Sequence, residues 1–231
     1  MNLHFHREID EVEIVHFAEN DTIITSKFNI IKIKSGYKEI EIILPIAKLK
    51  TLIGKFRIIR RALRLDKCNV VLLRKKIIKL VIIYQGNVYA YNEKVGLKKT
   101  LVLKNCRNVL HLSIAVLPNG EIVFGEYGNN KERKKVHIYS SSDCGETWKK
   151  IYTFPRNSIK HIHGCYWDHV EKKIWVSTGD FKDECKIITF NDKLNYIETI
   201  GEGTQEWRTV SFFLKSITYI GLWTHHWRKA R

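Results

Sequence analysis

Val88-Tyr89-Ala90-Tyr91 is a short run of β-branched and aromatic residues that returns twice along the chain. His137-Ile138-Tyr139-Ser140 follows about 50 residues later, and Ile187-Ile188-Thr189-Phe190 about 50 residues after that. The runs at 121–124 and 173–176, which precede the second and third copies, resemble each other as well. Short apolar runs between turn signals are typical of strands. A unit of four strands that repeats every 40–50 residues or so is typical of a β-propeller blade.

The repeat predicts an all-β chain, a β-propeller of four-stranded antiparallel blades that is incomplete at about four blades and carries one basic helical insertion. Residues 1–231 then form a single partial propeller. Its segments are 21–44 (a partial first blade), 46–66 (a basic helical connector), the blades 67–104, 106–154 and 159–200, and 205–223 (the start of a further blade).

Two segments of this division depart from the strand pattern. In the connector, apolar residues at 46, 49, 52, 53, 56, 59 and 63 have the spacing of an amphipathic helix, which Gly54 weakens. Residues 223–231 have no strand pattern. We interpret the chain as a truncation or frameshift product. The alternative is a ring that closes on another copy through an open blade edge.

Composition excludes several classes of protein. The 231 residues are 44% apolar and 11% aromatic, so the chain can bury a sizeable core and is not intrinsically disordered. It contains no stretch of about 18 uncharged apolar residues, and we expect no membrane span. The first eight residues are too polar for a signal peptide. Five cysteines without a C-x-x-C pair predict reduced thiols and a cytoplasmic location.

The net charge of +16 is concentrated in one segment. Residues 48–79 contain twelve lysines and arginines and a single acid, Asp66. Such a cluster suits a polyanion or an anionic surface as partner. A solvated basic face with no partner is the other interpretation, and the sequence leaves both open.

Ser141-Ser142-Asp143-Cys144-Gly145-Glu146-Thr147-Trp148 fits the pattern S-x-D-x-G-x-T-W at every defined position. An Asp carboxylate can accept backbone N–H bonds across a tight turn, and glycine supplies a conformation that other residues avoid. Trp148 would bury its ring against the next blade. Ser141, Asp143, Gly145, Thr147 and Trp148 are therefore expected to serve the fold rather than a ligand. Asn92 and Asn191 open degraded copies of the same turn.

This motif is the Asp-box of sialidase-like (BNR-repeat) propellers, and a longer part of the chain, 54–223, resembles an uncharacterised bacterial and archaeal family of such proteins. The resemblance rests on the stretches 56–64, 124–127, 161–164, 175–180 and 205–208. It implies a sialidase-like propeller without an assigned activity. The sequence departs from the family pattern after Trp223.

In a four-stranded meander, alternate connections share one end of the sheet. The second-to-third-strand loops and the crossings between blades then lie opposite the Asp-box turn. Propellers usually bind ligands near the innermost strands, so residues in these loops and crossings are the candidates. As catalytic residues we expect Glu126, Tyr127 and Asp180, and as ligand-binding residues His161, His163, Glu206, Trp207 and Arg208.

Glutamate, tyrosine and aspartate are the residue types of glycoside hydrolysis, so an enzymatic activity, if the chain has one, would be of that kind. Sialidases also clamp a carboxylate with three arginines, and only Arg107 and Arg208 are suitably placed, which argues against sialidase activity. His161 and His163 point to one side of a strand and could hold a metal with Asp180 and Glu126. We favour a histidine–carboxylate hydrogen bond instead and predict neither metal nor cofactor.

The sequence thus favours a sialidase-like propeller that binds a carbohydrate or another polar small molecule at its channel mouth. One alternative is a non-enzymatic scaffold that docks on nucleic acid or another polyanion through 48–79. A non-functional fragment is the other.

Overall fold

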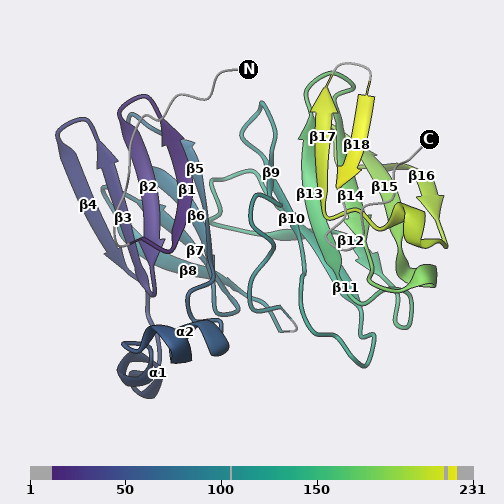
Figure 1. Cartoon of the computed structure of the whole chain (residues 1–231). Helices are drawn as coiled ribbons and strands as arrows, with labels where there is room; N and C mark the ends of the chain where they lie inside the picture. The colour runs from purple at the N-terminus through teal and green to yellow at the C-terminus, as the bar shows by residue number, and fades with distance from the viewer. Residues whose placement is uncertain (1–11, 105, 216–217, 223–231) are drawn as a thin grey trace, which may run out of the picture. The chain divides into compact units, whose positions relative to one another are not determined.

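The computed structural model describes residues 12–104, 106–215 and 218–222 of the chain, and Figure 1 shows sheets through most of them. The chain divides into two compact units, one ending at Val70 and one beginning at Val71. Within the described ranges the two α-helices have six residues each, and no helix is long and apolar enough to cross a membrane. The predicted tail at 223–231 lies outside the described residues.

The first unit contains one complete four-stranded blade. Its strands are β1 (Ile14–Glu19), β2 (Thr22–Lys27), β3 (Ile30–Ser35) and β4 (Lys38–Ile43), paired antiparallel in chain order. Strand β1 lies before residue 21, where the sequence placed the start of a partial blade. None of the six residues of β1 is fully buried, so the strand lacks the apolar alternation that identifies its neighbours.

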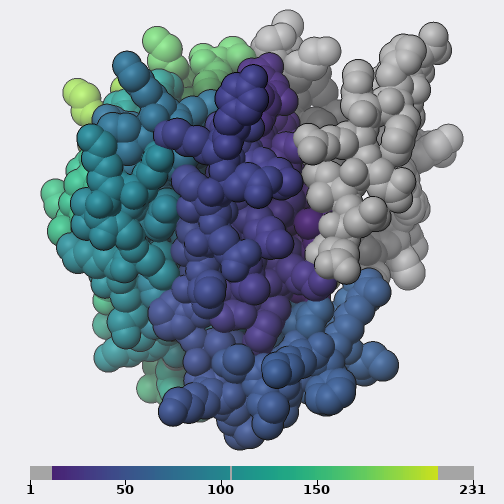
Figure 2. Space-filling model, turned by 90° about the vertical axis from the view of Figure 1, so that its left-hand side faces the viewer, coloured from purple at the N-terminus to yellow at the C-terminus, as the bar shows by residue number. Residues whose placement is uncertain are grey.

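The basic connector forms two short helices, α1 (Lys48–Ile53) and α2 (Arg57–Ala62), rather than one amphipathic helix. The break follows Gly54, where an added Cβ would lie 2.3 Å from Cζ of Phe28. The predicted apolar face is largely in solvent, because Leu49, Leu52 and Phe56 are exposed. Figure 2 shows this segment, in blue, at the surface below the purple strands of the same unit.

An ion pair, not an apolar face, anchors this segment. The Arg60 guanidinium is buried, and its Nε and Nη2 lie 2.8 and 2.6 Å from Oε1 of Glu13. Its Nη1 donates to the Gly54 carbonyl at 2.7 Å. Arg60 is therefore a structural residue of the connector, and the exposed arginines around it carry the surface charge.

The second unit repeats the meander. Strands β5 (Cys68–Arg74, which begins before the unit boundary), β6 (Lys79–Tyr84), β7 (Asn87–Asn92) and β8 (Gly96–Val102) form one sheet. The next sheet consists of β9 (Ala115–Val116), β10 (Ile122–Gly125), β11 (Val136–Ser141) and β12 (Lys149–Phe154). The third consists of β13 (Ile162–Asp168), β14 (Lys173–Thr178), β15 (Lys186–Asn191) and β16 (Tyr196–Glu202), and β17 (Ser211–Lys215) pairs with β18 (Thr218–Leu222).

The repeating runs from the sequence are the third strands β7, β11 and β15, so the predicted repeat is confirmed. Sheet faces of successive blades in this unit bury shared cores. Val81 and Ile83 of β6 pack with Phe124 of β10, and Val123 of β10 packs with Val176 of β14. Each such side chain contributes about 1.5–3 kcal/mol on burial. The chain is an incomplete β-propeller.

The Asp-box forms the turn between β11 and β12. Asp143 Oδ1 accepts the Thr147 N–H at 2.9 Å and the Ser141 hydroxyl at 2.8 Å, while Oδ2 accepts the Thr147 hydroxyl at 2.6 Å. Gly145 has a φ of +86°, which favours glycine, and a Cβ there would lie 2.5 Å from Val81 Cγ2. In the other two blades Asn92 and Asn191 accept backbone N–H bonds at the same turn.

Trp148 joins two blades, but its neighbour is the preceding blade rather than the next one. The indole Nε1 donates to Thr100 Oγ1 in β8 and to the Gly145 carbonyl, each at 3.1 Å. The ring also meets Phe124 edge to face with centroids 5.0 Å apart. The Asp-box therefore fixes the indole that closes the contact between these two sheets.

We expect Asp143→Asn to lower the free energy of unfolding by about 1 kcal/mol at pH 7, because hydrogen bonds to a charged acceptor are weakened at an exposed turn where solvent screens the charge. Partial burial acts to raise the pKa of Asp143, but hydrogen bonds from Thr147 and Ser141 hold it below its ordinary value. A lowered pKa stabilises the fold above the unfolded-state value of about 4 and loses that effect as the pH falls. Urea denaturation should thus show the difference from wild type shrinking below about pH 4.

Asp192→Asn is the matched control for this prediction, since Asp192 is an exposed residue of the equivalent turn in the next blade. Equal losses for Asp143→Asn and Asp192→Asn at pH 7 would contradict the assigned role of Asp143.

Candidate functional site

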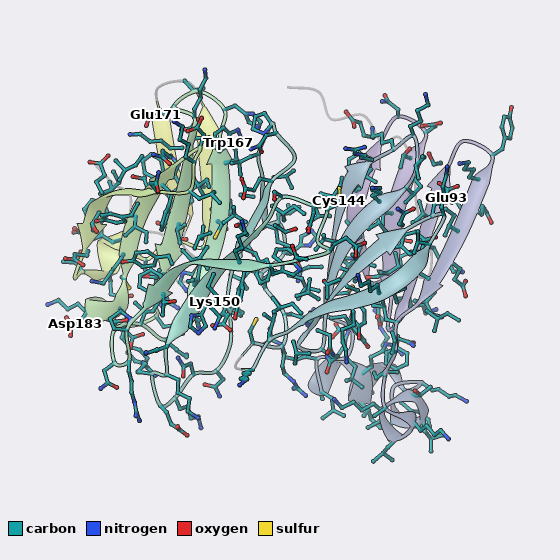
Figure 3. All side chains as sticks on the ribbon, turned by 180° about the vertical axis from the view of Figure 1, so that it is seen from behind. Glu93, Cys144, Lys150, Trp167, Glu171 and Asp183 are labelled. Atoms are coloured by element: carbon teal, nitrogen blue, oxygen red, sulfur yellow. The ribbon has the colours of Figure 1, made fainter. Side chains whose placement is uncertain are left out.

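In the second unit, alternate connections lie at opposite ends of a blade, as strand order predicts. In the blade β13–β16, Figure 3 shows Glu171, between β13 and β14, at the upper end and Asp183, between β14 and β15, at the lower end. Cys144 of the Asp-box turn also lies at the upper end. The candidate residues Tyr127, His161 and Asp180 belong to the connections of the opposite type, so they share the end away from the Asp-box.

Three connections bring the central group together. His161 and His163 lie at the start of β13, where the pairing of β13 with β14 shifts register between Ile162 and Gly164. Asp180 follows β14, and Arg208 follows the 3₁₀ helix η2 (Gln205–Trp207) in the crossing to β17. The predicted residues His161, His163, Asp180 and Arg208 are thus neighbours in space although 47 residues separate the outermost pair.

Asp180 is the centre of this group. Its Oδ1 lies 3.5 Å from His161 Nε2, 3.4 Å from His163 Nε2 and 3.2 Å from Arg208 Nη2. Its Oδ2 accepts a 2.6 Å bond from the Lys160 ammonium. The imidazoles of His161 and His163, together with Lys160, hold the pKa of Asp180 well below its usual range, so the carboxylate is ionised.

Backbone carbonyls fix both imidazole rings. His161 Nδ1 lies 2.8 Å from the Gly128 carbonyl oxygen, and His163 Nδ1 lies 2.8 Å from that of Thr209. A carbonyl oxygen only accepts, so each Nδ1 must carry the proton. Nε2 of each ring faces Asp180: it donates to the carboxylate when the imidazole is protonated and presents a lone pair when the imidazole is neutral. Both histidines are buried, and His161 Nε2 has no hydrogen-bond partner.

Tyr127 forms an aromatic wall of the site. It is partly exposed, and its ring centroid lies 4.4 Å from that of His161 and 6.4 Å from that of His163. An aromatic face of this kind, beside an ionised carboxylate and two cationic side chains, can pack against the apolar face of a sugar ring while charged groups bind its hydroxyls.

Glu126 lies next to Tyr127 in sequence, but its carboxylate serves strand β11. It accepts the His137 N–H at 2.9 Å and the Tyr139 hydroxyl at 3.4 Å. Burial raises the pKa of Glu126 although the His137 bond opposes this effect. Among the described residues no hydrogen bond joins the Glu126 and Asp180 side chains.

The other predicted residues differ in their surroundings. The Trp207 ring covers Gly201, where an added Cβ would lie 2.2 Å from the indole. Glu206 is exposed, and Arg208 pairs with Asp180. Arg107, the second arginine considered for a sialidase clamp, is exposed in the crossing between β8 and β9.

Two contributors were missed from the sequence, Lys160 and Gln205. Lys160 directly precedes His161, and its N–H donates to Glu184 while its ammonium binds Asp180. Gln205 donates to the Asp180 carbonyl at 3.2 Å. Polar residues flanking a predicted site residue are common on any loop, so nothing in the sequence separated these two from their neighbours.

Comparison with known proteins supplies little beyond the architecture. No family model matches the sequence, and no curated protein matches it. Among solved structures, the chain is similar to a luciferin-regenerating enzyme (TM-score 0.46, 12% identity), covering 84% of this chain and 64% of that one. It is also similar to the Swd1 β-propeller domain of Myceliophteria thermophila (TM-score 0.45, 9% identity, covering 80% and 57%). A third is BBS1N in complex with ARL6DN (0.47, 12%, covering 83% and 47%). The chain spans about half to two thirds of these structures.

Gly179 positions Asp180, and its replacement provides a test of that role. Its φ is +77°, and an added Cβ would lie 2.1 Å from the Glu184 carbonyl oxygen, a backbone atom that cannot move independently. We expect Gly179→Ala to lower the free energy of unfolding by about 2 kcal/mol or more, from strain and overlap together. Urea denaturation measures this loss.

Gly120→Ala is the control, because Gly120 has a φ of +85° with no atom within 4 Å of the added Cβ. Only the strain remains there, about 1 kcal/mol. Equal losses at the two glycines would refute the close approach between Gly179 and Glu184.

Proposed function

We propose that this chain is a sialidase-like, Asp-box propeller that binds a carbohydrate or a similar polar small molecule at the end of the blades that carries Asp180. The single observation behind the proposal is the convergence of Asp180, Arg208, Lys160 and two histidines beside the Tyr127 ring. Charged groups held in place by one another lose little entropy when they bind a ligand.

The turn chemistry supports the sialidase-like part of the proposal. All five defined positions of the Asp-box are present, and Ser141, Asp143 and Thr147 make the hydrogen bonds that explain their spacing. The Asp-box stabilises the fold, so it supports the assignment of the type of propeller but gives no information on the ligand. The cysteines, all free thiols in the structure, support the cytoplasmic location that we propose with it.

The site suits binding better than hydrolysis. Glycoside hydrolysis requires two carboxyl groups on either side of the bond to be cleaved. Asp180 is ionised and enclosed by cations, and the Glu126 carboxylate is buried against strand β11. Tyr127 is then a stacking residue in our proposal, and Glu126 supports the loop that presents it. His161, His163, Trp207 and Arg208 contribute the walls, and exposed Glu206 lies at the edge.

Asp180→Asn tests the proposal. Loss of the charged acceptor should weaken carbohydrate binding at least about tenfold, since a hydrogen bond to a charged group contributes about 1.5–3 kcal/mol. Calorimetric titration with neutral and uronic-acid oligosaccharides, selected on a glycan array, measures this effect. Asp192→Asn, at the other end of the same blade, should leave the affinity unchanged.

The proposal fails if the array is silent with the folded protein, or if both aspartate variants bind as the wild type does. Release of reducing sugar by the wild type, lost in Asp180→Asn, would replace binding with hydrolysis.

A second function is favoured by the connector. Its exposed side chains alternate between basic and apolar, with Arg57, Arg61 and Arg64 beside Leu52, Phe56 and Ile58. Nucleic acid would gain little from the exposed aliphatic groups, whereas an anionic lipid surface takes both kinds of side chain. We propose that the segment 48–67 docks on anionic membrane surfaces.

Vesicle co-sedimentation tests this second function, using phosphatidylcholine vesicles with and without phosphatidylserine. Arg57, Arg61 and Arg64 replaced together by Ser should lose at least about tenfold in binding to the anionic vesicles, as each basic residue contributes about 1 kcal/mol. Leu52, Phe56 and Ile58 replaced by Ser should also weaken binding. Arg60 is left intact because it anchors the connector.

Replacement of the exposed lysines Lys131, Lys135 and Lys193 is the charge-matched control and should leave binding unchanged. If DNA or RNA binds with a steep salt dependence while the apolar variant behaves as wild type, the partner is nucleic acid and the lipid proposal is wrong.

A further inference from the structure

We infer that His161, His163 and Asp180 bind one divalent transition-metal ion, with zinc as the best fit and at least one coordination position open. The ligand atoms are His161 Nε2, His163 Nε2 and Asp180 Oδ1, which lie within 4.8 Å of one another. The inference concerns these side chains alone and holds whether or not the chain binds a carbohydrate.

Three electron-pair donors point at one place in this group. Because both Nδ1 atoms donate to backbone carbonyls, both neutral imidazoles present a lone pair at Nε2. The facing Asp180 Oδ1 is also an acceptor. Without a metal ion, a proton on Nε2 bridges to Oδ1, as in the 3.4 Å hydrogen bond of His163, and a metal ion that binds the three atoms replaces such protons. His161 carries the clearest sign, since it is 4% exposed and its Nε2 has no partner.

The spacing of the donors suits tetrahedral coordination. Zinc binds imidazole nitrogen and carboxylate oxygen at about 2.0–2.1 Å, so neighbouring ligands of a tetrahedron lie about 3.3–3.4 Å apart. Asp180 Oδ1 lies 3.4 Å from His163 Nε2 and 3.5 Å from His161 Nε2. An octahedral arrangement with the same bond lengths would place adjacent ligands about 2.9 Å apart. These two distances match a tetrahedral ion such as zinc, and the two Nε2 atoms lie within 4.8 Å of each other.

The surroundings of the three ligands are those of a metal centre. Histidine ligands usually donate their other ring N–H to a carbonyl or carboxylate, as His161 does to Gly128 and His163 to Thr209. Ligating carboxylates are in turn hydrogen-bonded, as Asp180 is to Lys160 and Arg208. Arg208 shares Oδ1 with the proposed ion, and a carboxylate oxygen has lone pairs for both. Asp180 is 22% exposed, which leaves a path for the ion and for a fourth ligand.

Metal titration of the full chain tests the assignment. After dialysis against a chelator, the protein should bind one equivalent of Zn²⁺ with a dissociation constant of about 1 µM or lower, measured against a chromophoric competitor. Co²⁺ should give the visible absorption of a tetrahedral site. His161→Ala, His163→Ala and Asp180→Asn should each weaken Zn²⁺ binding at least about a hundredfold, because they remove ligands rather than outer partners.

His169→Ala is the matched control, an exposed histidine in the turn after β13 at the other end of the same blade, and it should bind Zn²⁺ as the wild type does. Circular dichroism shows whether each variant folds. Zn²⁺ should also raise the melting temperature of the wild type and not that of Asp180→Asn, which changes shape least.

Two results would overturn the assignment. One is a wild-type chain that takes up no stoichiometric Zn²⁺ or Co²⁺, in which case the histidines are protonated partners of Asp180. The other is equal Zn²⁺ affinity in wild type and Asp180→Asn. Since no carbohydrate is present in these titrations, neither result depends on the outcome of the glycan experiment.

Discussion

Burial of sheet faces between consecutive blades is the constraint on which the second unit depends. A single meander has two faces, and Val123 of β10 packs with Val176 of β14 while Phe124 of β10 packs with Val81 of β6. Strands buried on both faces read as continuous apolar runs, such as Ile122–Gly125 with all four residues buried. The Asp-box acts at the same contact, because it fixes the Trp148 indole on Thr100 of the preceding blade.

Within each blade, the turns that stabilise the contact between blades lie at one end, and the connections that hold the candidate site residues lie at the other. Turns of one kind carry the side chains that complete blade contacts, with Asp143 accepting its own turn's donors. The second-to-third-strand loops and the crossings between blades do not make these turn contacts. They bring together Tyr127, His161, Asp180 and Arg208. The central carboxylate lies in the connection between β14 and β15 and receives its partners from two crossings, β12 to β13 and β16 to β17. The group therefore exists only when adjacent blades and the crossing into β17 are all in place.

Much of this could be predicted from the sequence, because it follows from period and strand order. The recurrence of 88–91 at 137–140 and 187–190 predicted the blades. The alternation of connections predicted that His161, Asp180 and Arg208 lie at the same end of the blades. Two predictions were wrong because the local sequence pattern did not match the burial in the folded chain. Strand β1 has no buried position and so no apolar pattern. The connector has apolar residues at helical spacing, but its helices bury Arg60 and not those residues. Lys160 gave no signal, since a lysine on a loop is usually solvated.

The two histidines illustrate a limit of another kind. Their spacing fixes a common side of the strand, and the sequence then allows either a hydrogen bond to a carboxylate or a shared metal ion. The choice depends on which ring nitrogen carries the proton, and that is set by the carbonyls of Gly128 and Thr209, 33 and 46 residues away from their histidines. A backbone carbonyl has no side chain to identify it. Only the folded chain shows that both Nε2 atoms face Asp180, and this arrangement is the basis on which we infer a metal site.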